Sequence, residues 1–318
     1  MKSKAFYMFP GQGAQYPGMA LDLLETGEPD IKQLFSLATD IIGKDIADIL
    51  LSSSPEELKK TDLAQPTITV ANLAAAAYLA KKGITPMGCA GFSLGEYSAL
   101  AAAGIISTED CLSLVTRRGI AMQAAIDNIP PGPSAPGMAA VIGLAPEQVE
   151  ALIAKWTESG LTGLNAANIN SPKQVVVSGS AEALEEAEKL FKEAGAKRYL
   201  RLQVAGPYHS PFMKEAAKEF DKYLDNVKFK DPLIPVFSNV NGKQIKSGDE
   251  AKALSHRQIL EGVRWTDEEA AIAALKPGLL LEVGPGKVLQ GLWKDTGSEI
   301  PCRTAGTVAD IITLMEEI

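Results

Sequence analysis

The sequence predicts an α/β protein, with a mostly parallel sheet covered by helices on both faces and a smaller unit inserted into it. Short apolar runs, the candidates for strands, alternate along most of the chain with longer segments of helical periodicity. This alternation is typical of parallel sheets. Between Pro130 and Gly137 the chain is rich in proline and glycine, and the spacing of its apolar runs changes beyond that segment. With 318 residues, 46% of them apolar, the chain can bury a large core.

The inserted unit follows the order β-α-β-β-α-β. Its expected strands cover residues 138–143, 164–168, 174–178 and 197–204, and its expected helices cover 146–157 and 181–194. This order is the ferredoxin-like arrangement. We therefore expect a ferredoxin-like subdomain over residues 137–204, with a cleft between it and the larger part.

The larger part has the remaining elements. Its expected strands are 4–9, the run that ends at Gly91, 233–238, 279–283 and a strand near Cys302, and its expected helices are 31–42, one from Ser54, 66–82, one from Leu94, 108–126, one ending near Leu224, 249–274, one ending near Lys294 and the last one to 318. Ser54 and Ser107 precede their helices as N-capping residues. Gly83 follows the long apolar helix as a C-terminal signal.

The overall charge excludes some functions. The formal net charge is −8, which argues against a nucleic-acid or anionic membrane surface. The most apolar helix candidate, residues 68–80, contains Asn72 and is shorter than the roughly 20 residues of a membrane span. The amino-terminal apolar run stops at Pro10, which is too short for a signal peptide. We expect a cytoplasmic protein.

Cysteine usage agrees with a reducing compartment. The three cysteines, Cys89, Cys111 and Cys302, lie far apart and form no C-x-x-C pair. We expect them to be small buried residues, and we assign no metal ligands.

The stretch from Gly91 to Gly95 has the pattern G-x-S-x-G between an expected strand and an expected helix. Two glycines allow a turn tight enough to lift the Ser93 hydroxyl above the sheet, at a helix N-terminus that favours developing negative charge. An acyl-transfer nucleophile needs this setting, although a capping serine would explain the same pattern. We expect residues 1–130 and 205–318 to form an α/β-hydrolase-like catalytic domain.

A serine nucleophile needs a base, and the chain has two histidines. His209 lies in a Gly-Pro-Tyr-His-Ser-Pro loop where the chain returns to the larger part. His256 lies in a polar helical stretch, where a solvated surface role is the simpler interpretation. His209 is the expected base, although it could instead cap its loop.

A third, acidic triad member is missing from the expected place. No Asp between Ser93 and His209 stands in a convincing strand-end loop, so a Ser-His pair oriented by a carbonyl is expected. Arg117 and Arg118 are adjacent on one helix, so only one of them should face inward. A buried guanidinium needs a carboxylate partner, which could be a substrate group or a structural ion pair.

Four segments together carry a family resemblance. They are Phe9–Gln15 (FPGQGAQ), Gly91–Tyr97 (GFSLGEY), Arg118–Gln123 (RGIAMQ) and Gly206–Pro211 (GPYHSP). With them the chain resembles malonyl-CoA:acyl carrier protein transacylases along essentially its whole length.

The resemblance implies a set of roles. Ser93 would be the nucleophile that accepts malonyl from malonyl-CoA, and His209 the base of a Ser-His dyad. The remaining implied roles are Gln12 and Leu94 as the oxyanion hole, Arg118 as the group that holds the malonyl carboxylate, and Gln258 as the source of the carbonyl that orients His209. The acceptor would be the phosphopantetheine thiol of an acyl carrier protein. No cofactor is implied, and we expect a monomer.

One position departs from many members of the family, because Phe92 stands where they have histidine. We expect activity to persist, with less certain acyl selectivity. Alternatives are a serine thioesterase or esterase that releases free acid, an acyltransferase that serves a polyketide synthase, and a carrier-binding scaffold without catalysis.

Overall fold

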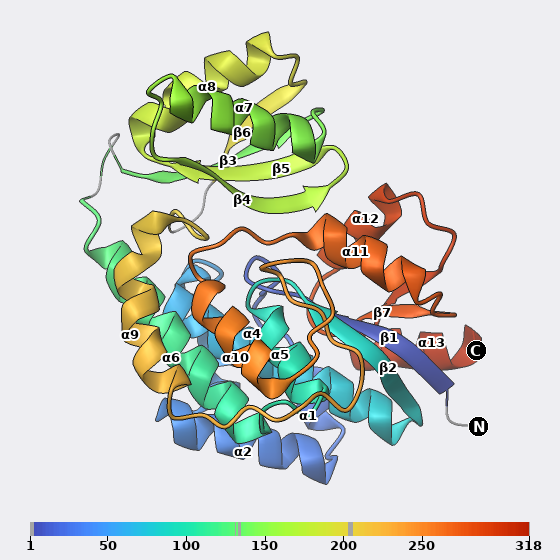
Figure 1. Ribbon diagram of the computed structural model, residues 1–318. Helices are drawn as coiled ribbons and strands as arrows, with labels where there is room; N and C mark the ends of the chain where they lie inside the picture. The colour runs from blue at the N-terminus through green and yellow to red at the C-terminus, as the bar shows by residue number, and fades with distance from the viewer. Residues whose placement is uncertain (1–2, 131, 133–134, 203–205, 318) are drawn as a thin grey trace.

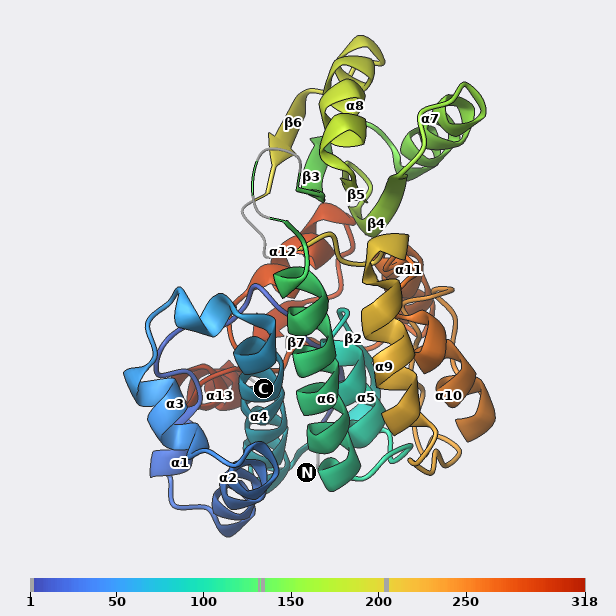
Figure 2. The ribbon, with the colours of Figure 1, turned by 90° about the vertical axis from the view of Figure 1, so that its left-hand side faces the viewer.

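The computed structural model describes residues 3–130, 132, 135–202 and 206–317. In this part of the chain the strands form two sheets of four strands each. One sheet belongs to a larger unit that holds both ends of the chain, and the other belongs to a smaller unit formed by residues 137–202 (Figures 1 and 2). The predicted mixed α/β architecture with a parallel sheet is confirmed.

The sheet of the larger unit has the strand order β2-β1-β7-β8, and all its pairs are parallel. Its strands are β1 (Ser3–Phe9), β2 (Ile84–Gly91), β7 (Leu280–Glu282) and β8 (Cys302–Thr304). In a parallel sheet all carboxyl ends lie at one edge, where ligands usually bind. The loop after β1, the turn at Ser93 after β2 and the turn at Gly284 after β7 therefore lie together.

Helices cover both faces of this sheet. They are α1 (Leu21–Glu25), α2 (Pro29–Ile42), α3 (Ile46–Ser52), α4 (Thr61–Lys81), α5 (Gly95–Ala102), α6 (Thr108–Asp127), α9 (Lys214–Leu224), α10 (Gly248–Arg257), α11 (Trp265–Ala274), α12 (Val288–Asp295) and α13 (Val308–Glu317), with short 3-10 turns η1 (Glu57–Lys59) and η2 (Pro211–Met213). The predicted cap at Ser107 is present, since its side chain accepts from Asp110 N at the start of α6, whereas the helix predicted from Ser54 is only the short turn η1, and there Ser54 Oγ accepts from Glu57 N. The central helix α4 is buried along most of its length, as its apolar sequence predicts.

The smaller unit contains β3 (Gly137–Ile142), α7 (Pro146–Glu158), β4 (Leu164–Ser171), β5 (Gln174–Gly179), α8 (Ala181–Glu193) and β6 (Arg198–Arg201). Its sheet has the order β4-β5-β3-β6 with antiparallel pairs. One face packs against α7 and α8 around Val149 and Phe191. On the other face Met138 and Val176 pack against Tyr208, which belongs to the larger unit.

A backbone bridge joins the two units. Ile169 N donates to Val263 O at 2.8 Å, and Val263 N donates to Ala167 O at 2.9 Å. Next to this bridge Arg264 of the larger unit forms an ion pair with Glu150 of α7 at 3.0 Å. The smaller unit is thus attached to the segment between α10 and α11.

Three sequence predictions for the larger unit need correction. The long helix α4 begins at Thr61 and not at Pro66, which lies inside it. A proline near the start of a helix forfeits one backbone bond, and the N-terminal N–H group of the helix, at the buried Thr61, donates to Gln123 Oε1. Residues 233–238 form only isolated bridges, because Pro232 and Pro235 lack the N–H groups that a ladder needs.

The third correction concerns residues 249–274, which are not one mostly helical segment. The helix stops at Arg257 and resumes at Trp265, and the intervening loop pairs with β4 of the smaller unit. The predicted boundaries at 204 and 205, and part of the proline-rich segment 130–136, lie outside the described residues. None of the described helices is long and apolar enough to cross a membrane.

Replacing Gly95 with Ala should severely destabilise the protein, because a Cβ there would overlap the carbonyl oxygen of Phe9. We expect the free energy of unfolding to fall by about 3 kcal/mol, measured by urea titration. Gly291→Ala is the matched control, since its Cβ would meet nothing within 4 Å and helix α12 would gain about 0.5 kcal/mol. Equal stability of the two variants would contradict this packing argument.

Candidate active site

Ser93 occupies a strained turn between β2 and α5. Its φ is 50°, in the left-handed region that costs a non-glycine residue on the order of 1–3 kcal/mol. Both motif glycines are required by close packing, since a Cβ on Gly91 would overlap the backbone of Gly95, and a Cβ on Gly95 would overlap Phe9. The turn therefore presents the Ser93 hydroxyl at the start of α5, as the sequence predicts.

The Ser93 hydroxyl contacts an imidazole. Ser93 Oγ lies 2.8 Å from His209 Nε2, and His209 Nδ1 lies 2.9 Å from Gln258 O and 3.0 Å from Glu261 O. Carbonyl oxygens only accept hydrogen bonds, so Nδ1 carries the proton and Nε2 is free to accept the serine proton. The predicted orienting carbonyl of Gln258 is present, and that of Glu261 adds a second one.

The backbone N–H groups of Gln12 and Leu94 have no backbone partner among the described residues, and both residues line the same pocket as Ser93. The loop after β1 passes so close to the elbow that a Cβ on Gly11 would overlap the Phe92 carbonyl and stand 3.5 Å from Leu94 N. This close approach brings the Gln12 loop beside the Leu94 amide. The Gln12 side chain donates to Tyr208 OH at 3.2 Å, which anchors the loop.

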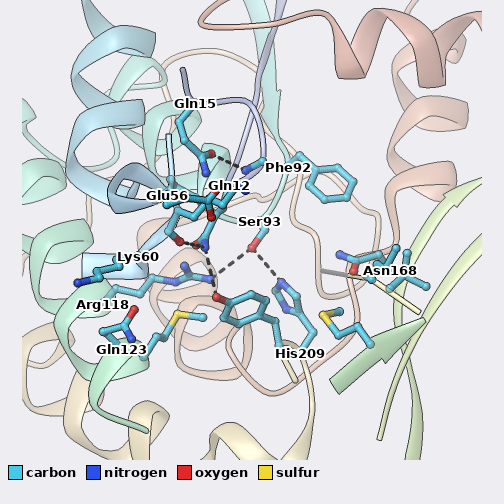
Figure 3. A pocket seen from close by; sticks show the side chains of 18 of the residues that line it. Gln12, Gln15, Glu56, Lys60, Phe92, Ser93, Arg118, Gln123, Asn168 and His209 are labelled. Atoms are coloured by element: carbon cyan, nitrogen blue, oxygen red, sulfur yellow. Dashed lines mark hydrogen bonds and ion pairs between the residues drawn. The ribbon is translucent and has the colours of Figure 1, made fainter. Parts of the chain in front are cut away.

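Of the two adjacent arginines on α6, only Arg118 faces inward, as predicted. Its side chain is 1% exposed, whereas Arg117 is exposed and lies over the Tyr223 ring. Arg118 Nη2 donates to Ser93 Oγ at 3.4 Å (Figure 3) and to Gln258 Oε1 at 3.1 Å, and its Nε atom has no partner among the described residues. A cation with an unused donor thus lies beside the serine hydroxyl.

A cavity of about 510 Å³ opens over these side chains. The larger unit lines it with Ser93, Arg118 and His209, and the smaller unit contributes Met138, Asn168, Val176 and Leu202. Figure 3 shows Ser93 between Arg118 and His209, with Asn168 beyond His209 on the side away from Arg118. The exposed Lys59 and Lys60 also line this cavity. The cavity therefore combines an apolar wall, a nucleophile with a base, and a buried cation.

The comparisons with known proteins agree with this site. A model of the acyl transferase domain matches residues 6–317. The malonyl CoA-acyl carrier protein transacylase of Haemophilus influenzae is 40% identical over 318 residues, covering 98% of this chain and 99% of the relative. The chain belongs to this acyltransferase family. The family predicted from the sequence is confirmed.

Solved structures of family members have the same fold as this chain. An acyl carrier protein S-malonyltransferase from Vibrio cholerae is 37% identical, with a TM-score of 0.90 over 98% of this chain and 100% of that one. A malonyl-transacylase solved in complex with its type II polyketide acyl-carrier protein is 36% identical, with a TM-score of 0.89 over 99% of this chain and 100% of that one.

Sequence reasoning missed a polar network behind the nucleophile of this acyltransferase. Asn239 Oδ1 accepts from Ser93 N at 2.6 Å, and Asn239 Nδ2 donates to Gly91 O at 2.7 Å, so this amide fixes the elbow from behind. Glu96 accepts from the Gln258 side chain at 2.7 Å. No sequence signal marks Asn239, whereas Glu96 directly follows the G-x-S-x-G motif.

Two other candidates lie away from this network. The sequence predicts a solvated surface role for His256; it lies in α10 with its side chain 29% exposed and its Nδ1 atom 2.6 Å from Asp221 Oδ1, away from Ser93. Phe92 stands edge-on to Trp265, with ring centroids 5.4 Å apart, and also lines the cavity. Among the described residues no group of three His, Cys, Asp or Glu side chains could hold a metal ion.

The electrostatics of the site keep the base neutral. Burial, and then the charge of Arg118, lower the pKa of His209 to about 4. Burial raises the pKa of Glu96 to about 7. The neutral imidazole that a general base requires therefore exists at all pH values above about 4.

The acylation of Ser93 by p-nitrophenyl acetate should show this depressed pKa. This ester carries no carboxylate, so its reaction reports the dyad alone. We expect the rate of the nitrophenol burst to stay constant from pH 8 down to 5 and to reach half its value near pH 4, because only then does His209 take up a proton.

The matched variant is Arg118→Met. The pH at which its burst rate falls to half should be higher than in the wild type, because the neighbouring cation that lowers the pKa of His209 is gone. A wild-type midpoint near 6.5, the ordinary value of histidine, would contradict the burial of a neutral base.

Proposed function

We propose that this acyltransferase moves a malonyl group from malonyl-CoA to the phosphopantetheine thiol of an acyl carrier protein, through a malonyl ester on Ser93. The observation that carries the proposal is the buried Arg118 guanidinium, 3.4 Å from the Ser93 hydroxyl. A neutral acyl group gives no reason to bury a cation there, whereas the free carboxylate of malonyl does.

The first half-reaction begins at the dyad. His209 Nε2 takes the Ser93 proton while Oγ attacks the thioester carbonyl, and the developing imidazolium is stabilised by the carbonyls of Gln258 and Glu261. The C–S bond then breaks, and the departing coenzyme A sulfur takes the proton from Nε2. The product is the malonyl ester of Ser93 and free coenzyme A.

The tetrahedral intermediate carries its negative charge on the former carbonyl oxygen. The free N–H groups of Gln12 and Leu94 are the donors that we assign to this oxyanion. Their alignment is supported by the contact of Gly11 with the elbow. Loss of one such donor typically costs on the order of 3 kcal/mol of transition-state stabilisation.

Arg118 would hold the malonyl carboxylate. In malonyl the carboxylate is separated from the reacting carbonyl by one methylene group, so a guanidinium close to Ser93 Oγ is well placed to bind it. The free Nε of Arg118 and its terminal nitrogens can form the paired hydrogen bonds that suit a carboxylate. Gln258, which is not among the cavity-lining residues, accepts from the guanidinium through Oε1 at 3.1 Å.

In the second half-reaction the carrier's thiol gives its proton to His209 and its sulfur attacks the ester. The C–O bond to Ser93 breaks, and Oγ regains the proton from Nε2. Water competes with the thiol in this step. The apolar wall formed by Met138, Val176 and Leu202 limits the positions that water can occupy beside the ester.

We also infer two domains, a catalytic α/β-hydrolase-like domain of residues 1–130 and 205–318 and a ferredoxin-like subdomain of residues 137–204. The β-α-β-β-α-β order with alternating antiparallel pairing supports the second assignment. In this arrangement both domains contribute walls to the cavity, so their attachment determines its width.

Replacing Arg118 with Ala should reduce kcat/KM for malonyl-CoA by about 100-fold, because a charged hydrogen-bond pair of this kind contributes about 1.5–3 kcal/mol. With acetyl-CoA, which has no carboxylate, we expect a change of less than about threefold. The measurement is transfer of each acyl group to a holo acyl carrier protein.

Arg117→Ala is the matched control, since this neighbour is exposed and should leave both substrates unaffected. Equal losses with both thioesters in Arg118→Ala would remove the carboxylate role. Rapid release of free malonate without any carrier would instead indicate a thioesterase.

A further inference from the structure

Glu96 is a buried acid for which the proposed reaction has no use. It is 2% exposed and follows the nucleophile elbow on the first turn of α5. Its Oε2 atom accepts two hydrogen bonds, from Gln258 Nε2 at 2.7 Å and from Asn239 N at 3.3 Å. Burying a carboxyl group costs free energy of folding, so we expect Glu96 to have a role that offsets this cost.

The contacts of Gln258 fix which way its amide points. Its NH₂ group faces Ser93 O at 2.9 Å and Glu96 Oε2 at 2.7 Å. A carbonyl oxygen can only accept, and Oε2 of Glu96 is held as an acceptor by two N–H donors whether or not the carboxyl carries a proton on its other oxygen. The amide oxygen of Gln258 must therefore face the opposite way.

On that opposite side lies Arg118, whose Nη2 donates to Gln258 Oε1 at 3.1 Å. If the amide were reversed, its NH₂ group would face the guanidinium, which has donors only. The other hydrogen bond of Arg118 among the described residues goes to Ser93 Oγ, and its guanidinium also lies over the Tyr97 ring. The orientation of one amide thus determines where the cation lies.

We propose that Glu96 is a positioning residue for acyl selectivity, which together with the Ser93 carbonyl fixes the orientation of the Gln258 amide and thereby holds Arg118 ready for the substrate carboxylate. This inference rests on the proposed function of Arg118. It assigns to Glu96 no contact with substrate. Loss of Glu96 should therefore affect only substrates whose carboxylate binds the Arg118 guanidinium.

The test uses Glu96→Met, which has a similar volume but no acceptor. We expect KM for malonyl-CoA to rise about tenfold with kcat/KM for acetyl-CoA changed less than twofold, both measured by transfer to a holo acyl carrier protein. Glu96→Gln keeps an oxygen that can accept from Gln258 and Asn239, so it should restore the selectivity to within about threefold of wild type.

Glu269→Met is the matched control. Glu269 is also a buried acid, 1% exposed, but its partner is Trp265 Nε1 at 2.9 Å and it does not contact Gln258. This variant should keep the wild-type ratio of the two substrates. Should Glu96→Met fail to fold, Glu96→Asp withdraws the carboxylate by one methylene and should produce a smaller loss in the same direction.

A second variant tests whether Glu96 acts through the amide. Gln258→Met removes the side-chain amide but keeps the backbone carbonyl that accepts from His209. In this background Glu96→Met should change the malonyl-to-acetyl ratio less than twofold. A full additive loss would overturn the proposed route.

The outcomes separate the two proposals. Selectivity that survives in Glu96→Met but is lost in Arg118→Ala would overturn the role of Glu96 and leave the proposed function intact. If Glu96→Met loses the same fraction of kcat/KM with malonyl-CoA and with acetyl-CoA, Glu96 has only a structural role and the inference is overturned. Wild-type protein that does not distinguish malonyl from acetyl thioesters would instead overturn the proposed function.

Discussion

The burial of a guanidinium beside a serine hydroxyl is the constraint on which the site depends. A cation that is 1% exposed needs acceptors, and in the described part of the chain Arg118 donates to the side-chain oxygens of Gln258 and Ser93 and lies over the Tyr97 ring. The same charge helps to keep His209 neutral, since it lowers the pKa of that imidazole. Arg118 therefore adds to the effect of burial on the base, and in our proposal the same residue binds the substrate carboxylate.

The segment between α10 and α11 connects this site to the smaller unit. It supplies the two carbonyls, of Gln258 and Glu261, that accept from His209, and a few residues later Val263 pairs with β4. A displacement of the smaller unit would thus pull on the loop that orients the imidazole. The backbone bridge between Val263 and β4 therefore affects two features of the site: the position of the cavity wall that the smaller unit forms, and the orientation of His209.

Much of this site could be predicted from the sequence, because its signals are local. The elbow glycines predict the position of Ser93, and the spacing of two arginines on one helix predicts that one is buried. The resemblance to the family adds the carbonyl of Gln258. Contacts between distant segments left no such signal, so the partnership of Asn239 with the Ser93 amide and the break that separates α10 from α11 could not be predicted.

The central claim is that Ser93 carries malonyl between two thiols, and intact-mass spectrometry tests it most directly. Wild-type protein incubated with malonyl-CoA should gain the mass of one malonyl group on the peptide that contains Ser93, and should lose it when holo acyl carrier protein is added. Ser93→Ala should gain nothing. An adduct that forms equally in Ser93→Ala, or the absence of any adduct on the wild-type protein, would contradict the account.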